Sequence, residues 1–207
     1  MSMSEVETFL HPTTREQLME VYTLDHSRLR PTLSGVDNSL KKIKEIRLIE
    51  NSPDDRKLTY FVALYVSADE PILEKDLERW LWDNKLLYGK PKERARVAFR
   101  ANFFVRRKFQ EAGLATHLCG KEEEYFRAWG AEEIQVAAME MGRWVWTRPR
   151  FGYQIATLEF ESMQEKYKEW QRAQRIFPVV RAARLSDFPR EFLLGDEVGS
   201  LPLYKEL

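Results

Sequence analysis

The residues with the clearest chemical potential lie in the middle of the chain, in the segment Gln110-Glu-Ala-Gly-Leu-Ala115. Gly113 permits a tight turn and lets a ligand approach the backbone closely. A helix that begins here directs free amides and the positive end of its dipole at an anion, so the amides of residues 111–116 could hold a pyrophosphate. The segment is neither a Walker loop nor a Rossmann GxGxxG. A plain strand-to-helix turn is the alternative, and it stays open.

The residues before this segment are strongly basic. Between Lys90 and Lys108 one acidic residue, Glu93, stands against eight lysines and arginines. Such a run favours a phosphate-bearing partner, of which nucleic acid is one candidate. Charges of this kind also line solvated strand edges, where they prevent aggregation, and this alternative stays open. No zinc-finger, RNP or helix-turn-helix motif is present, so a nucleic-acid partner is not expected.

Two elements must position the candidate phosphate cradle. Alternating apolar residues predict a strand from Arg96 to Val105, with residues 97, 99, 101, 103 and 105 on one face. Helical spacing of apolar residues predicts a helix from Gly113 to Trp129, and Gly130 suits its C-terminal cap. The sequence therefore predicts strand, turn and helix in that order around Gly113.

The rest of the chain is predicted to alternate between helices and strands. Capping boxes, apolar periodicity and turn residues set the boundaries. The predicted helices are Thr13 to about Arg30, Pro71 to about Tyr88, a turn at 142–147, and Ser162 to about Arg175. The predicted strands are Ile43–Glu50, Leu58–Val66, Glu133–Met139, Phe151–Phe160 and Val179–Leu185, and the tail from Ser186 is unassigned.

This arrangement resembles the Gcn5-related N-acetyltransferase (GNAT) superfamily. That family's acyl-CoA motif reads Gln/Arg-x-x-Gly-x-Gly/Ala at the start of the helix after its central strand, and Gln110, Gly113 and Ala115 fill the three positions. Downstream, Gly130-Ala, the strand at 134–139, Gly142-Arg-Trp-Val-Trp and Phe151-Gly-Tyr follow the family's order. The match covers about residues 96–160. It implies an α/β fold with a GNAT-like mixed central sheet and helices on both faces, forming a single domain over residues 1–207 with a C-terminal extension from about residue 161.

The resemblance also implies a function, an acyl-CoA-dependent N-acyltransferase that passes an acetyl or longer acyl group to an unidentified amine by direct attack. No metal is expected. The oxyanion would be polarised by a strand amide near Phe104 or Val105. Glu140 would be a candidate catalytic base, or alternatively a helix cap, and Trp146 stands where the family often has a catalytic Tyr. The implied CoA-binding residues are Phe103, Phe104, Val105, Arg106, Arg107, Gln110, Glu111, Ala112, Gly113, Leu114, Ala115 and Thr116.

Three features depart from the family's pattern. The indole of Trp146 cannot act as a general acid at neutral pH. A predicted helix at 71–88 separates the hairpin from the motif strand, and another at 162–175 follows where a hairpin is usual. Two alternatives therefore stay open: a catalytically inactive binding or regulatory module of this fold, and an N-acyl synthase that uses an acyl carrier protein.

Composition excludes other classes. The 207 residues carry 33 basic and 33 acidic side chains, and 43% are hydrophobic, so neither a disordered chain nor a general polyanion binder is expected. Cys119 is the lone cysteine, and the three histidines lack ligand spacing, which argues against disulfides and zinc. No signal peptide or membrane-spanning run is recognised, so a cytoplasmic protein is expected. A homodimer is compatible with the sequence.

Overall fold

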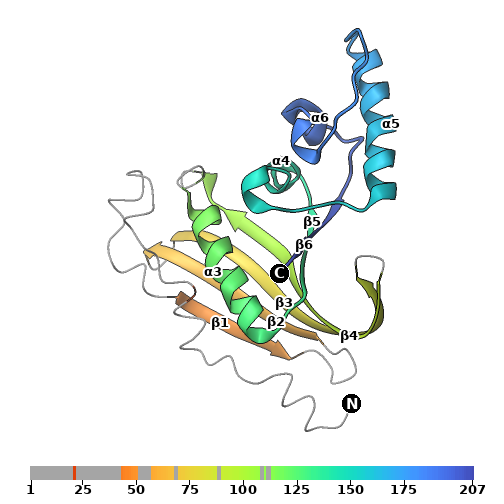
Figure 1. The fold of residues 1–207 in the computed structure, drawn as a ribbon. Coiled ribbons are helices and arrows are strands. Elements are labelled where there is room, and N and C mark those ends of the chain that lie inside the picture. Colours follow the sequence, from red (N-terminus) through yellow and green to blue (C-terminus); the bar gives the residue numbers. More distant parts are fainter. Residues whose placement is uncertain are drawn as a thin grey trace. The chain divides into compact units, whose positions relative to one another are not determined.

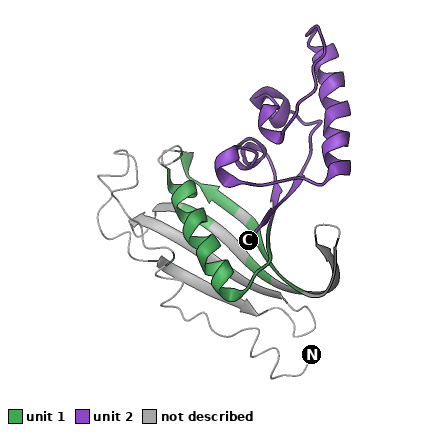
Figure 2. Cartoon of the chain, viewed as in Figure 1, with its two compact units in different colours: residues 1–134, 207 green, residues 135–206 purple. Residues whose placement is uncertain are grey.

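The computed structural model describes residues 21, 43–50, 57–67, 70–87, 90–107, 110 and 113–207. It combines a six-stranded sheet with helices, which confirms the mixed α/β class (Figure 1). The chain divides into two compact units, residues 1–134 with 207 and residues 135–206 (Figure 2), and each is described by itself below. The predicted helix from Thr13 lies outside the described residues except for Val21, which is helical and buried. The single domain with a C-terminal extension stays a prediction.

The first unit is built on a meander of long antiparallel strands. Each strand pairs with the next one along the chain, and the strands of the sheet keep the order β1-β2-β3-β4-β5-β6. The hairpin predicted from residues 43–50 and 58–66 is confirmed. The four strands are β1 (Ile43–Glu50), β2 (Lys57–Ser67), β3 (Glu70–Leu87) and β4 (Lys90–Val105).

Strand β3 occupies the segment for which a helix from Pro71 to Tyr88 is predicted, so that prediction is wrong. Its Leu, Glu, Lys and Arg residues favour a helix locally, but by only tenths of a kcal/mol each. The backbone of β3 pairs with β2 on one edge and with β4 on the other. Hydrogen bonds on both edges outweigh the helical propensity. No helix therefore separates the hairpin from β4.

Strand β4 carries one extra residue in its middle. Arg100 pairs with Leu77 and Asn102 pairs with Asp76, so two steps along β4 match one step along β3. Ala101 is the inserted residue, and its side chain is exposed. This is the arrangement of a β-bulge, which kinks a strand and interrupts its ladder locally.

The bulge exchanges the two faces of β4. Before it, Val97 lies on one face and Arg100 on the other; beyond it, Phe103 and Val105 lie on the face of Arg100. The prediction that residues 97 to 105 share one apolar face is therefore wrong beyond residue 99. Bulges are common beside active sites because they re-aim side chains and free backbone groups.

Helix α3 (Leu114–Trp129) follows β4, as predicted. Gly113 and Gly130 bound it, each in the left-handed conformation, with φ values of 87° and 81°. Leu118 and Phe126 are fully buried on its inner face. Both glycines adopt conformations that other L-residues rarely take, which explains why the helix ends where it does.

Two buried arginines of the sheet hold α3 in place. The Arg100 Nε lies 3.0 Å from the Glu122 carboxylate, with both side chains fully buried, and its Nη2 donates to the Cys119 carbonyl at 3.3 Å. The Arg79 guanidinium lies 4.6 Å from the ring centroid of Tyr125 and 4.8 Å from that of Trp129. These contacts fix the register of the helix on β3 and β4.

The second unit contains short elements around one long helix. Strand β5 begins in the last residues of the first unit, and the predicted strand from Glu133 is confirmed. The elements are β5 (Glu133–Ala138), α4 (Met141–Trp146), η6 (Pro149–Phe151), α5 (Thr157–Ala173), η7 (Leu185–Asp187), α6 (Arg190–Leu194) and β6 (Leu201–Glu206).

Two predicted strands of this unit are wrong. Of the strand predicted from Phe151 to Phe160, only an isolated bridge between Gln154 and Tyr204 forms, and α5 begins at Thr157. The predicted capping box at Ser162 therefore lies inside the helix. The segment 179–185 contains no strand, because glutamine side chains of α5 bond its backbone in place of a neighbouring strand.

Candidate functional site

The turn between β4 and α3 is closed by its glutamine. The Gln110 side chain donates from Nε2 to the Val105 carbonyl at 2.9 Å, and its amide donates to the Arg107 carbonyl at 3.2 Å. These two bonds return the chain to the end of the strand, so the helix begins directly beyond it. Gln110 therefore has a local structural role, and its role in CoA binding stays a prediction.

Gly113 forms the N-cap of α3 with φ 87° and ψ −1°. The first helical bond runs from the His117 amide to the Gly113 carbonyl at 3.0 Å, so the amides of Leu114, Ala115 and Thr116 have no acceptor within the helix. No side chain of the described residues caps this end, and the first turn of α3 holds no acidic residue. The helix N-terminus can therefore receive an anion.

The other predicted CoA-binding residues differ in exposure. Phe103 and Val105 are half-buried, whereas Phe104 is 45% exposed. The Arg106 guanidinium lies 5.4 Å from the Phe104 ring centroid and 3.7 Å from the Glu74 carboxylate, which partly neutralises it. Of the remainder, Arg107 and Thr116 are exposed, Ala115 is half-buried, the Leu114 side chain is buried, and Glu111 and Ala112 lie outside the described residues.

The junction between the C-terminal end of β4 and the N-terminal end of α3 fits a phosphate-bearing ligand. It presents a glycine at the cap, amides without acceptors in the helix, and no carboxylate in the first turn. Arg107 is exposed and adds positive charge before the turn. Such a set of donors suits the pyrophosphate of coenzyme A.

Glu140 occupies a strained turn at the end of β5. Its φ of 45° and ψ of −127° belong to the second position of a type II′ turn, and the Gly142 amide closes that turn on the Met139 carbonyl at 2.8 Å. That position strongly favours glycine. The carboxylate is exposed and forms no side-chain cap on α4, so the capping role considered above is not realised.

Trp146 is a packed core residue. Its indole meets Phe151 edge-on at 4.9 Å between centroids and Tyr153 at 5.7 Å, and only 5% of the residue is exposed. Trp144 instead stacks under the Arg148 guanidinium, 3.6 Å from its ring centroid. Burial and the charge of Arg150 lower the pKa of Arg148. Neither indole presents a proton donor of the kind an acyl transfer needs.

Arg143 is a residue that sequence reasoning missed. Its buried guanidinium donates to the carbonyls of Leu194 at 3.2 Å and of Gly195 and Gly199 at 3.0 Å, and its Nε lies 3.4 Å from the Glu140 carbonyl. It thus ties the strained turn to the segment that follows α6. Because its carbonyl acceptors lie some 50 positions away, no local sequence pattern marks Arg143 as a structural residue.

The described residues contain no cluster of three or more His, Cys, Asp or Glu placed to hold a metal ion. Among their helices, none has both the length and the apolar character needed to cross a bilayer.

Comparisons with known proteins give distant similarities. No protein-family model matches the chain, and no curated protein does. Among solved structures, the chain is similar to a Bacillus subtilis acetyltransferase in complex with CoA, at 13% identity over 79% of this chain and 98% of that one, with a TM-score of 0.36. It is also similar to AtaTR bound with AcCoA, at 14% identity over 50% and 66% of the two chains and a TM-score of 0.36. A third is an aminoglycoside acetyltransferase from an uncultured soil sample, at 12% identity over 73% and 80%, with a TM-score of 0.26.

Two of these three structures are described as acetyltransferases, and the third is described as bound to AcCoA. The likeness is divergent, with every TM-score below 0.5.

Proposed function

We propose that this protein is an acyl-CoA-dependent N-acyltransferase. The observation that carries the proposal is the N-terminus of α3, where left-handed Gly113 begins a helix whose first amides have no helical acceptor and, among the described residues, no capping side chain. In the proposed complex, the amides of Leu114, Ala115 and Thr116 bind the pyrophosphate of the acyl donor. Arg107 adds charge to the same ligand.

The proposed reaction is a direct transfer. The donor supplies an activated thioester. The amine attacks its carbonyl carbon, which forms the C–N bond and an oxyanion, and collapse of that intermediate breaks the C–S bond and releases CoA as a thiolate that takes a proton from water. In the proposed mechanism, a β4 amide near Phe104 or Val105 stabilises the oxyanion. The amine releases a proton, for which exposed Glu140 is the proposed acceptor. The acceptor substrate is an amine of unspecified size.

Thermal unfolding with acetyl-CoA, longer acyl-CoAs and free CoA tests donor binding. A ligand at about a hundred times its Kd stabilises the native state by about 2.7 kcal/mol. We expect stabilisation of the native protein and its loss in Gly113→Glu, which places a carboxylate at the anion site.

The matched control is Gly199→Glu. Gly199 also has a positive φ, of 68°, and a Cβ there would meet nothing within 4 Å, so the two variants share the backbone penalty and the added charge. Stabilisation by CoA should persist in this control. No stabilisation of the native protein by any of the thioesters or by CoA would overturn the proposal.

A binding or regulatory module without turnover is the second candidate function. The packing of Trp146 against Phe151 and Tyr153 favours it, because this leaves the position of the family's catalytic Tyr without a proton donor. Release of the CoA thiol with a panel of amines separates the two candidates. Binding without thiol release from any amine supports the module, whereas release supports the enzyme.

A further inference from the structure

Helix α5 holds the segment that follows it through two glutamines. The Gln171 side chain accepts from the Val180 amide at 2.9 Å and donates to the Val180 carbonyl at 2.8 Å. Gln164, on the same face of the helix two turns earlier, accepts from the Ala182 amide at 3.2 Å and donates to the Ala182 carbonyl. Each side chain thus bonds both backbone groups of one residue, as a neighbouring β-strand would.

This pairing leaves one edge of the segment open. In an extended chain the backbone groups of successive residues point to opposite sides. Because Val180 and Ala182 bond toward α5, the amide and carbonyl of Arg181 point away from it, and those of Val179 do the same. Within residues 113–207, which the structure describes without a gap, no hydrogen bond reaches the backbone of Val179 or Arg181. The segment is therefore an unpaired strand edge, which is a template for strand addition.

The arm, as we name residues 171–184, is positively charged. It contains Arg172, Arg175, Arg181 and Arg184, all exposed, and no acidic residue occurs between Glu169 and Asp187. Arg184 forms an ion pair with Asp187 at 3.9 Å, and Arg172 and Arg181 lie close enough to Glu165 on α5 for their charges to act on its carboxylate. The pKa of Glu165 on α5 is lowered by a hydrogen bond from Lys168 and by the positive charges of Arg181 and Arg172. The charge of the arm favours an anionic partner.

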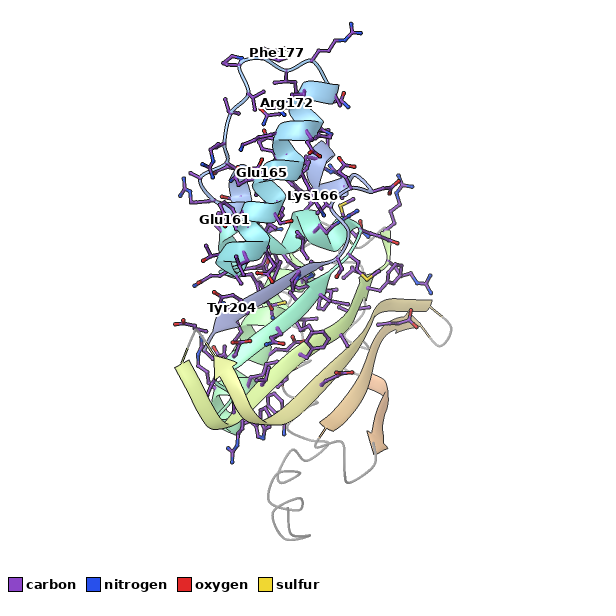
Figure 3. The ribbon with its side chains drawn as sticks, turned by 90° about the vertical axis from the view of Figure 1, so that its right-hand side faces the viewer. Glu161, Glu165, Lys166, Arg172, Phe177 and Tyr204 are labelled. Carbon is purple, nitrogen blue, oxygen red and sulfur yellow. The ribbon has the colours of Figure 1, made fainter. Side chains whose placement is uncertain are left out.

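The arm also exposes apolar side chains. Phe177 is 72% exposed, Val180 51% and Ile176 41%. Figure 3 shows Phe177 in the loop beyond the C-terminal end of α5, past Arg172. Nucleic-acid platforms stack successive bases on several aromatic rings, whereas the arm exposes one ring and two aliphatic chains. An apolar surface beside an open backbone edge fits a polypeptide better than a nucleic acid.

We propose that the arm is a docking site for an extended acidic peptide segment of a partner protein, which adds as a strand to the Val179–Arg181 edge. The backbone of the partner pairs with Arg181, its carboxylates meet the arginines, and its apolar residues cover Val180 and Phe177. This inference lies in the second unit and does not depend on the proposed acyl transfer.

Fluorescence anisotropy of the full chain tests the proposal. The probe is a labelled eight-residue peptide of alternating Glu and Val, compared with a Lys and Val peptide and with poly(U) RNA of equal charge. We expect the acidic peptide to bind at least tenfold more tightly than either. Full N-methylation of the peptide, which removes every amide donor, should weaken binding at least fivefold.

Two variants at one position separate backbone pairing from charge. Arg181→Ala removes the guanidinium and keeps the amide, whereas Arg181→Pro removes both while leaving the bonds of Val180 and Ala182 to α5 possible. We expect the proline variant to bind the acidic peptide at least fivefold more weakly than the alanine variant. Equal binding by the N-methylated and unmethylated peptides to the native chain, or tighter binding of poly(U), would overturn the proposal even if the proline variant failed to fold.

Discussion

Replacing Glu140 by glycine should stabilise the protein while removing a candidate catalytic group. The φ and ψ of Glu140, 45° and −127°, lie where a residue with a Cβ costs about 1–3 kcal/mol. Glycine removes that strain, but it also has more conformational freedom in the unfolded chain, which lowers the stability of the folded state by about 0.5–1 kcal/mol. The net expectation is a rise of about 1 kcal/mol in the free energy of unfolding, which for a chain of this size raises Tm by about 2–4 °C.

Glu140→Gln is the matched control, because it removes the negative charge and leaves the backbone penalty in place. We expect its free energy of unfolding to stay within about 0.5 kcal/mol of the native value. If the carboxylate accepts the proton of the amine, both variants should lose about a hundredfold in turnover, measured as thiol release from acetyl-CoA. A glycine variant with a Tm no higher than that of the glutamine variant would refute the strain reasoning. A glutamine variant with full turnover would refute the role of the carboxylate.

Three further outcomes concern the packing around these sites. Arg100→Met or Glu122→Leu alone should cost about 3–5 kcal/mol in urea unfolding, because each leaves one buried charge without its partner, whereas the double variant should recover most of that loss. Arg143→Met should cost at least about 2 kcal/mol and speed hydrogen exchange in residues 194–199, whose carbonyls lose their donors; unchanged exchange would contradict the clamp. Burial raises the pKa of Tyr167 above 10.0, so the native state keeps a proton that the unfolded chain releases, and stability should fall as pH rises beyond 10. Tyr167→Phe should flatten that alkaline limb in denaturation curves.

The junction around Gly113 could be predicted because its causes are local. Three local signals act within a few residues of each other. They are a glycine that adopts a left-handed φ, alternating apolar residues before it, and apolar residues at helical spacing after it. The same holds at Gly130, where the cap and the end of α3 agree with the prediction. The presence and order of strand, turn and helix follow from the sequence at these positions.

The misassigned segments depend on distant partners. The segment of β3 has helical spacing and helix-favouring residues, yet it lies between two strands that pair with it on both edges. The bulge at Ala101 is equally non-local, because it exists only in the register against β3. Arg143 bonds carbonyls more than 50 positions away, which no motif records. Such features depend on which distant segments meet in the folded chain, so they can be assigned only once the fold is known.

Strand β3 changes how the chain compares with the GNAT pattern described from its sequence. With the helix predicted at 71–88 replaced by a strand, the hairpin leads through β3 to the strand before Gly113, and one of the three departures from the GNAT pattern disappears. The helix after residue 156 remains, beginning at Thr157 and extending to Ala173. That helix carries Gln164 and Gln171, which hold the arginine-rich arm in an extended form. The helix that departs from the pattern is thus the one that leaves the backbone edge of Val179 and Arg181 unpaired within residues 113–207.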